Sequence, residues 1–148
     1  MPEVQYDFAG RRAGLSVVGN IVGNGLDLTA VAVGATITIG AESTDVRNIT
    51  IQLTDANGAN LAERASFILG VYSSAAGTTF ASTGGSTGVA GAVANTTLTL
   101  SAKKLFYCTT TATGGWTGTW TDTATETFAL GVQLPSGRTV MSTAQANA

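Results

Sequence analysis

The sequence predicts an all-β fold, an antiparallel β-sandwich or partly closed β-barrel that follows an extended N-terminal arm. Six threonines occupy every second position from Thr117 to Thr127, and period two is the repeat of a strand with two different faces. Similar alternation recurs in short segments from residue 35 to residue 142, and turn-forming residues separate these segments. No long segment has the apolar spacing of an amphipathic helix, so a sandwich or barrel is the expected architecture.

Residues 1–33 differ from the rest and are interpreted as the arm, with the β-domain spanning residues 34–148. Glycines interrupt each apolar cluster of this segment, so neither a continuous helical stripe nor a regular strand is predicted. The segment is nevertheless too apolar for a solvated linker, because large side chains recur at Tyr6, Phe8, Leu15, Val17, Val18, Ile21, Val22, Leu26 and Leu28. Such an arm either folds back onto its own domain or becomes ordered on a neighbouring molecule. Attachment to a neighbour is the interpretation we carry forward.

Seven to nine strands are expected after the arm. The first pair covers residues 35–39 and 46–53, and the sequence Asp55-Ala56-Asn57-Gly58 then predicts a turn that reverses the chain. Residues 74–95 are dominated by Ser, Gly, Ala and Thr, which favours a long surface loop or two short strands. The remaining predicted strands cover residues 66–73, 96–101, 105–109, 128–134 and 139–142, the last two joined by a hairpin at residues 135–138.

The threonine repeat is predicted to form two strands and the turn between them. One strand of that length would span about 40 Å, which is long for a small domain. A single strand would also place Asp122 and Glu126 on the same face as Trp116 and Trp120. A bend between Thr121 and Thr125 removes this conflict.

The composition excludes several functional classes. Only 11% of residues are charged and the net charge is −2, so no basic surface for nucleic acid is expected. Histidine is absent and Cys108 is the single cysteine, so this chain cannot supply a His-dependent catalytic triad or a thiolate zinc cluster. No signal peptide or membrane segment is recognised, and we expect no enzymatic activity, no metal, no cofactor and no membrane association. The protein is expected to be made and kept in a cytosol, unless it leaves as part of a particle.

Two acidic residues beside two tryptophans suggest an alternative function. Trp116 and Trp120 could stack on sugar rings, and Asp122 with Glu126 could form a pair of glycosidase carboxylates across a bend. The preferred interpretation is that the acids keep a turn soluble and that the tryptophans belong to the core or to a subunit interface. Asp45, Asp55 and Asp122 lack the spacing of a calcium loop.

Two segments, residues 46–64 and 128–140, resemble small structural proteins of tailed bacteriophages, which often occur as head decoration (cement) proteins. The resemblance rests on the strand and turn sequences VRNITIQLTDANGANLAER and FALGVQLPSGRTV. Decoration proteins of this kind are typically trimers that clamp neighbouring capsid subunits, often through an extended N-terminal arm. The resemblance therefore implies a virion protein on the capsid exterior, with the major capsid protein and copies of itself as partners.

The expected function is thus a structural one, with a carbohydrate-binding or adhesion module and a phage tail or fibre component as alternatives. The expected partner-binding residues are the arm side chains and the two tryptophans, namely Tyr6, Phe8, Arg11, Arg12, Trp116 and Trp120. Arg11 and Arg12 are the only paired basic residues of the arm, and their guanidinium groups suit carboxylates on a partner. Expected partners do not include nucleic acid.

Overall fold

A computed structural model describes residues 30–83, 85–93 and 96–147. These residues form two antiparallel sheets that pack face to face as a β-sandwich, and no α-helix occurs among them. The sandwich is therefore confirmed, and the sheets do not close into the alternative barrel. The arm residues Tyr6, Phe8, Arg11 and Arg12 lie outside the described residues.

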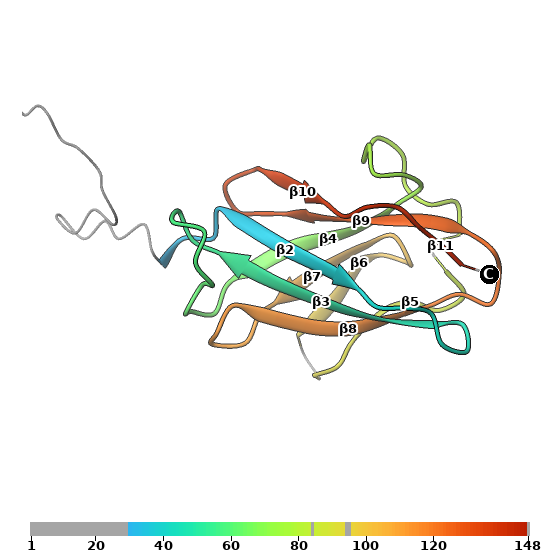
Figure 1. Ribbon diagram of the computed structural model, residues 1–148, viewed down its shortest axis with the longest axis horizontal. Coiled ribbons are helices and arrows are strands. Elements are labelled where there is room, and N and C mark those ends of the chain that lie inside the picture. The colour runs from blue at the N-terminus through green and yellow to red at the C-terminus, as the bar shows by residue number, and fades with distance from the viewer. Residues whose placement is uncertain (1–29, 84, 94–95, 148) are drawn as a thin grey trace, which may run out of the picture.

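The first sheet has six strands and the second has four, and in Figure 1 the strands of both sheets run along the length of the domain. The six-stranded sheet has the order β10, β9, β4, β7, β6, with β11 also paired to β9. Its strands are β4 (Ser66–Tyr72), β6 (Thr97–Ser101), β7 (Leu105–Thr109), β9 (Thr127–Gln133), β10 (Thr139–Met141) and β11 (Gln145–Ala146). The four-stranded sheet has the order β2, β3, β8, β5, with β2 (Gly34–Ile39), β3 (Val46–Thr54), β5 (Gly88–Gly91) and β8 (Gly115–Thr121).

Alternation along each strand creates the core between the sheets. In β3 the buried side chains Ile49, Ile51 and Leu53 alternate with the more exposed positions, as a strand with one covered face requires. Their counterparts from β9 are Phe128, Leu130 and Val132, all fully buried. Aromatic rings join the two layers, because Trp120 of β8 stacks on Phe128 with a centroid distance of 3.7 Å. Trp116 meets Phe67 of β4 edge to face at 6.2 Å.

The predicted turns lie where the sequence places them. Asp55 caps its own turn, since its Oδ1 accepts hydrogen bonds from the backbone N–H groups of Asn57 and Ala59 at 2.7 and 3.0 Å. Gly58 adopts the positive φ of 81° that this turn requires. The chain then reverses, and Leu61 donates its N–H to the carbonyl of Leu53. The hairpin between β9 and β10 is also confirmed.

The threonine repeat divides as predicted. β8 ends at Thr121 in the four-stranded sheet, and β9 begins at Thr127 in the six-stranded sheet. Residues 122–126 therefore carry the chain from one layer of the sandwich to the other. The described residues form one strand more than the upper expectation of nine, because the two-residue β11 was not predicted. Residues 74–95 contribute one short strand, β5, to the edge of its sheet.

Candidate interaction surface

The two tryptophans expected to bind a partner lie inside the sandwich. Trp116 and Trp120 are 2% and 0% exposed, and both point from β8 toward the opposite sheet. Their rings are covered by Phe67 and Phe128 of the same chain. The Trp116 indole nitrogen donates a hydrogen bond to Thr97 Oγ1 at 3.2 Å. Neither ring offers a face on which a sugar could stack, so these residues act in this structure as core.

The single cysteine is a buried structural side chain. Cys108 points into the core from β7 and is free. Burial raises the pKa of its thiol from 9.0 to about 12, and a hydrogen bond with the Thr97 side chain opposes this shift. The thiolate required for nucleophilic attack is therefore scarce near neutral pH.

The two acidic residues near the tryptophans hold loops in place. Asp122 is 2% exposed, and its Oδ1 accepts hydrogen bonds from Ser86 Oγ at 3.3 Å and from the backbone N–H of Ala124 at 3.2 Å. Its Oδ2 has no hydrogen-bond partner among the described residues. The interpretation of Asp122 as a solubilising turn residue is therefore wrong, because the change of sheet at this point draws its side chain inward.

Glu126 binds the loop that precedes β5. Its Oε1 accepts hydrogen bonds from Ser82 Oγ at 3.1 Å and from both the backbone N–H and the Oγ1 of Thr83 at 3.0 Å. Both carboxylates thus bind protein groups instead of facing each other across an open cleft. Within the described ranges, no three His, Cys, Asp or Glu side chains gather as a metal ion would require.

A buried arginine joins the C-terminal residues to the β2–β3 hairpin. Arg47 Nε donates to Asn147 Oδ1 at 2.8 Å, and its Nη2 donates to the carbonyl of Ala146 at 2.7 Å. Nη1 donates to the carbonyl of Gly40, and Nη2 forms an ion pair with Glu42 at 3.3 Å. Asn147 also donates from its amide to the carbonyl of Asp122. This network was not predicted, since Arg47 and Asn147 lie 100 positions apart in the sequence.

The outer face of the four-stranded sheet is rich in hydroxyl groups. Thr38, Thr50 and Thr117 stand opposite one another across β2, β3 and β8. Thr50 and Thr117 are exposed, as alternation with the buried core positions requires. Much of the threonine repeat therefore faces solvent, where a hydroxyl group keeps its hydrogen bonds to water.

The outer face of the six-stranded sheet is apolar by comparison. The register places Gln133 of β9, Ile68 of β4, Tyr107 of β7 and Leu98 of β6 in one row across four strands. Leu98, a large apolar residue, is 62% exposed, and the aromatic residue Tyr107 is 42% exposed. None of the residues in the six strands of this sheet is charged. We call the side chains of Ile68, Leu98, Leu105, Tyr107 and Gln133 the uncharged outer face.

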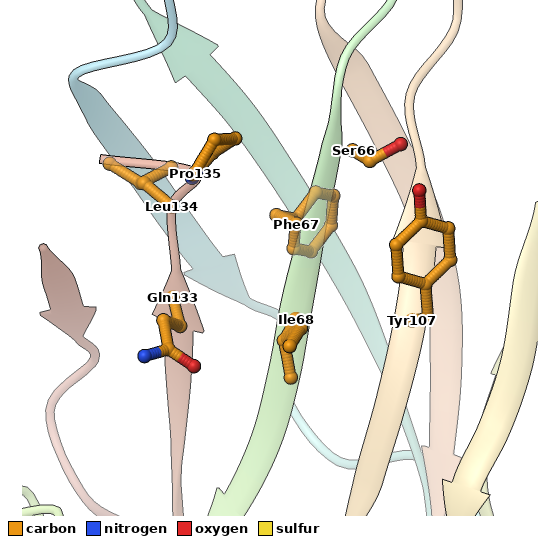
Figure 2. Close-up of a pocket in the computed structure, with 7 residues that line it drawn as sticks. All are labelled: Ser66, Phe67, Ile68, Tyr107, Gln133, Leu134 and Pro135. Carbon is orange, nitrogen blue, oxygen red and sulfur yellow. The ribbon is translucent and has the colours of Figure 1, made fainter. Parts of the chain in front are cut away.

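Two grooves lie on either side of Tyr107 on this face. The first has a volume of about 310 Å³ and is lined by Ser66, Phe67, Ile68, Tyr107, Gln133, Leu134 and Pro135. Figure 2 shows Gln133, Ile68 and Tyr107 side by side on neighbouring strands, with Ser66 and Pro135 toward one end of the groove. The second groove, also about 310 Å³, is lined by Thr96, Thr97, Leu98, Tyr107 and Thr109. A partner that lay across this face would therefore find two hollows divided by an aromatic ring.

Further along the same face, an aromatic pair covers the glycines of the sheet. A Cβ atom at Gly70 or at Gly131 would lie 2.6 Å from Tyr72 Cε2, so the Tyr72 ring lies directly over both. Phe80 then stacks on Tyr72 with a centroid distance of 5.0 Å. This end of the outer face is covered by the protein itself, whereas the row from Gln133 to Leu98 is left open.

Comparisons with family models, with curated proteins and with solved structures found no match to this chain. No helix in the described part of the chain is long and apolar enough to cross a membrane.

Proposed function

We propose that this protein is a non-enzymatic virion protein that decorates and stabilises a phage capsid. It acts as a homotrimer on the capsid exterior, where it clamps neighbouring subunits of the major capsid protein. The β-sandwich provides the body of each subunit, and residues 1–33 attach it to the shell.

The uncharged outer face is the observation that carries this proposal. A soluble monomer rarely exposes a contiguous apolar surface unless that surface binds something. Here the exposed Leu98 and Tyr107 belong to a sheet that contains no charged residue in any strand. Depletion of charge together with exposed aromatic and aliphatic side chains is typical of the centre of a protein interface. A subunit of a larger assembly has such a surface.

The chemistry of the described residues also favours a structural function. Cys108 is buried with a raised thiol pKa, and the carboxylates of Asp122 and Glu126 hold loops. The segments that carry the resemblance to phage decoration proteins form β3 with its turn and the β9–β10 hairpin. These segments belong to opposite layers of the sandwich.

Stabilisation of the shell follows from mass action. A protein that binds only the assembled shell lowers its free energy by RT ln(1 + [L]/Kd), or about 2.7 kcal/mol per site at a concentration of 100 Kd. In the arm, Tyr6 and Phe8 supply apolar contact area, and Arg11 with Arg12 supplies fork-shaped donors for carboxylates of the capsid protein. Many equivalent sites on one shell multiply the effect.

Binding to shells that lack this protein tests the proposal. The full chain and a variant without residues 1–30 are mixed with such shells, and binding is measured by co-sedimentation. The full chain is expected to bind to saturation at a number of copies set by capsid symmetry, and the truncated chain is expected to remain folded but unbound. Saturation at only a few copies would favour a tail or fibre component instead. Absence of binding by the full chain would contradict the proposal.

The carbohydrate-binding alternative relied on Trp116 and Trp120 as stacking platforms, and both indole rings are buried against aromatic side chains of the opposite sheet.

A further inference from the structure

We propose that the free edge of β6 binds an extended segment of the major capsid protein, which joins the six-stranded sheet as an additional strand. The inference rests on the proposed function, because it takes its partner from that function, and it specifies how the β-sandwich itself contacts the shell. The segment that fits this edge is uncharged along the length of β6 and carries apolar side chains at alternate positions.

The backbone of β6 offers unpaired hydrogen-bonding groups along one side. β6 is the last strand of its sheet, and β7 is its only strand partner among the described residues. Thr109 donates its N–H to the carbonyl of Thr96 at 2.9 Å, so in the alternating antiparallel pattern Leu98 also turns its backbone groups toward β7. The N–H and C=O groups of Thr97 and Thr99 therefore point away from the sheet. Another extended chain presents donors and acceptors at the spacing of this row.

The edge lacks the features that usually prevent such pairing. β6 contains no charged residue and no proline, and both are commonly used to protect an exposed edge. A bulge between Thr99 and Ser101 interrupts the pairing with β7, so the added strand is expected to pair with the residues before it. The opposite edge strand, β10, has only three residues and directly follows Arg138. β6 is therefore the edge of this sheet that is better suited to receive a strand.

Exposed apolar side chains gather at the same edge. Those that belong to β6, to β7 or to the loop before β6 are Val93, Leu98, Leu100 and Tyr107. In the isolated chain these side chains are in contact with water, and an added strand would cover part of their apolar surface, which favours binding.

Two hollows open beside β6. On the uncharged outer face, the second groove lies between Leu98 and Tyr107 and has a volume of about 310 Å³. A smaller hollow of about 150 Å³ is lined by Val93, by Thr96 and, from the other sheet, by Trp116, so it lies where the two sheets meet. Successive side chains of a strand point to opposite faces. An added strand would therefore direct its side chains alternately toward one hollow and toward the other.

The charge at one end of β6 complements an acidic residue of the segment. The β6–β7 turn contains Lys103 and Lys104, and in the described part of the chain neither side chain forms an ion pair. A carboxylate at the end of the segment that passes this turn would fix its direction along β6.

A second copy of the chain is a poorer occupant of this edge. Pairing of β6 with β6 about a two-fold axis closes a dimer, which does not match the proposed homotrimer. The major capsid protein is the other partner in the proposed assembly.

Binding to shells that lack this protein tests the inference with Thr99→Pro in the full chain. Proline removes the outward N–H and cannot donate to an added strand. The matched control is Thr139→Pro on β10, because Thr139 is also exposed and its backbone groups also point away from its neighbour β9. The dissociation constant from co-sedimentation is expected to rise about tenfold or more for Thr99→Pro and to stay within about twofold of the wild type for Thr139→Pro.

The outcomes separate this inference from the proposed function. Equal affinities of the wild type and Thr99→Pro would overturn the inference and leave the proposed function standing, whereas absence of binding by the wild type would overturn both. In free solution, Thr99→Pro is expected to have the same oligomeric state as the wild type by sedimentation equilibrium. A smaller oligomer would assign β6 to a contact between copies and would also overturn the inference.

Hydrogen exchange of the wild type needs no substitution, so it decides the question even where Thr99→Pro does not fold. The backbone amides of Thr97 and Thr99 are expected to exchange about tenfold or more slowly on the shell than in the free protein, because each gains an acceptor. The amide of Thr139 is expected to exchange equally in both states. Unchanged exchange of the β6 amides in the bound protein would show that no strand is added at this edge.

Discussion

Removal of the buried guanidinium group by Arg47→Ala should destabilise the whole sandwich. The side chain donates hydrogen bonds to Asn147 Oδ1 and to the carbonyl groups of Gly40 and Ala146, and it forms an ion pair with Glu42. Truncation leaves Asn147 Oδ1 buried without this donor, and each unsatisfied buried group costs about 1–3 kcal/mol. Loss of one member of a buried ionic network typically costs about 3–5 kcal/mol. We expect the free energy of unfolding to fall by that amount.

Urea unfolding followed by tryptophan fluorescence measures this change, because both tryptophans are buried in the core. A loss of about 3–5 kcal/mol corresponds to a decrease in Tm of about 6–20 °C for a chain of this size. The control is Arg64→Ala, since Arg64 is exposed and has no hydrogen bond or ion pair among the described residues. Its expected effect is within about 0.5 kcal/mol of zero.

A double-mutant cycle with Asn147→Ala separates the network from general packing. The two side chains share a direct hydrogen bond of 2.8 Å, so their effects should be non-additive by about 0.5–3 kcal/mol. A loss below about 1 kcal/mol for Arg47→Ala, or additive effects in the cycle, would refute the reasoning that this network fastens the C-terminal residues to the β2–β3 hairpin.

Three further predictions concern packing and the thiol. Gly118→Ala should cost about 1–3 kcal/mol in urea unfolding, because a Cβ there would lie 2.5 Å from the carbonyl oxygen of Ala90 and would also meet the Trp116 ring. Gly115→Ala is the matched control, with no atom nearer than 3.4 Å, and equal losses in the two variants would contradict the prediction. Cys108 should resist a thiol reagent at pH 8 in the native state and react at once in urea; rapid native labelling would show that the thiol is accessible. Because burial raises the pKa of Cys108 from 9.0 to about 12, its contribution to stability is complete below pH 9 and is lost as pH rises toward 12. In that window the free energy of unfolding of the wild type should therefore fall by about 1.4 kcal/mol more per pH unit than that of Cys108→Ala. Parallel pH profiles of the two proteins would contradict this prediction.

Local pattern was sufficient to predict most strands. Alternation of the β3 side chains indicated a half-buried strand, and Asn57-Gly58 indicated the turn after it, because both depend on neighbours in the sequence. The bend in the threonine repeat was predictable from a local conflict, since Asp122 and Glu126 could not share a face with the tryptophans of one straight strand.

Features that depend on distant partners were not predictable in the same way. Burial of Asp122 results from the chain crossing between sheets, and no local pattern specifies which loops then cover it. The contacts of Arg47 with Ala146 and Asn147 join opposite ends of the described chain. The alternation of side chains along the strand correctly placed Trp116 and Trp120 on one face, but it does not reveal whether that face packs on another sheet or on a partner.

The full row of residues in the uncharged outer face could be recognised only from the register of the paired strands. Ile68, Tyr107 and Leu98 come from three strands, and their alignment in one row depends on pairings that the sequence does not specify. A signal was nevertheless present, since the segments that form the six-stranded sheet contain no charged residue. That regional absence of charge could have indicated which sheet has an uncharged outer face.

A density map of purified phage particles tests the proposed function most directly, through the copy number and position of this chain. The proposal predicts trimers of the β-sandwich on the capsid exterior, repeated with the capsid symmetry, with residues of the N-terminal arm in contact with major capsid subunits. A few copies at the tail, or no copies in the particle, would contradict it.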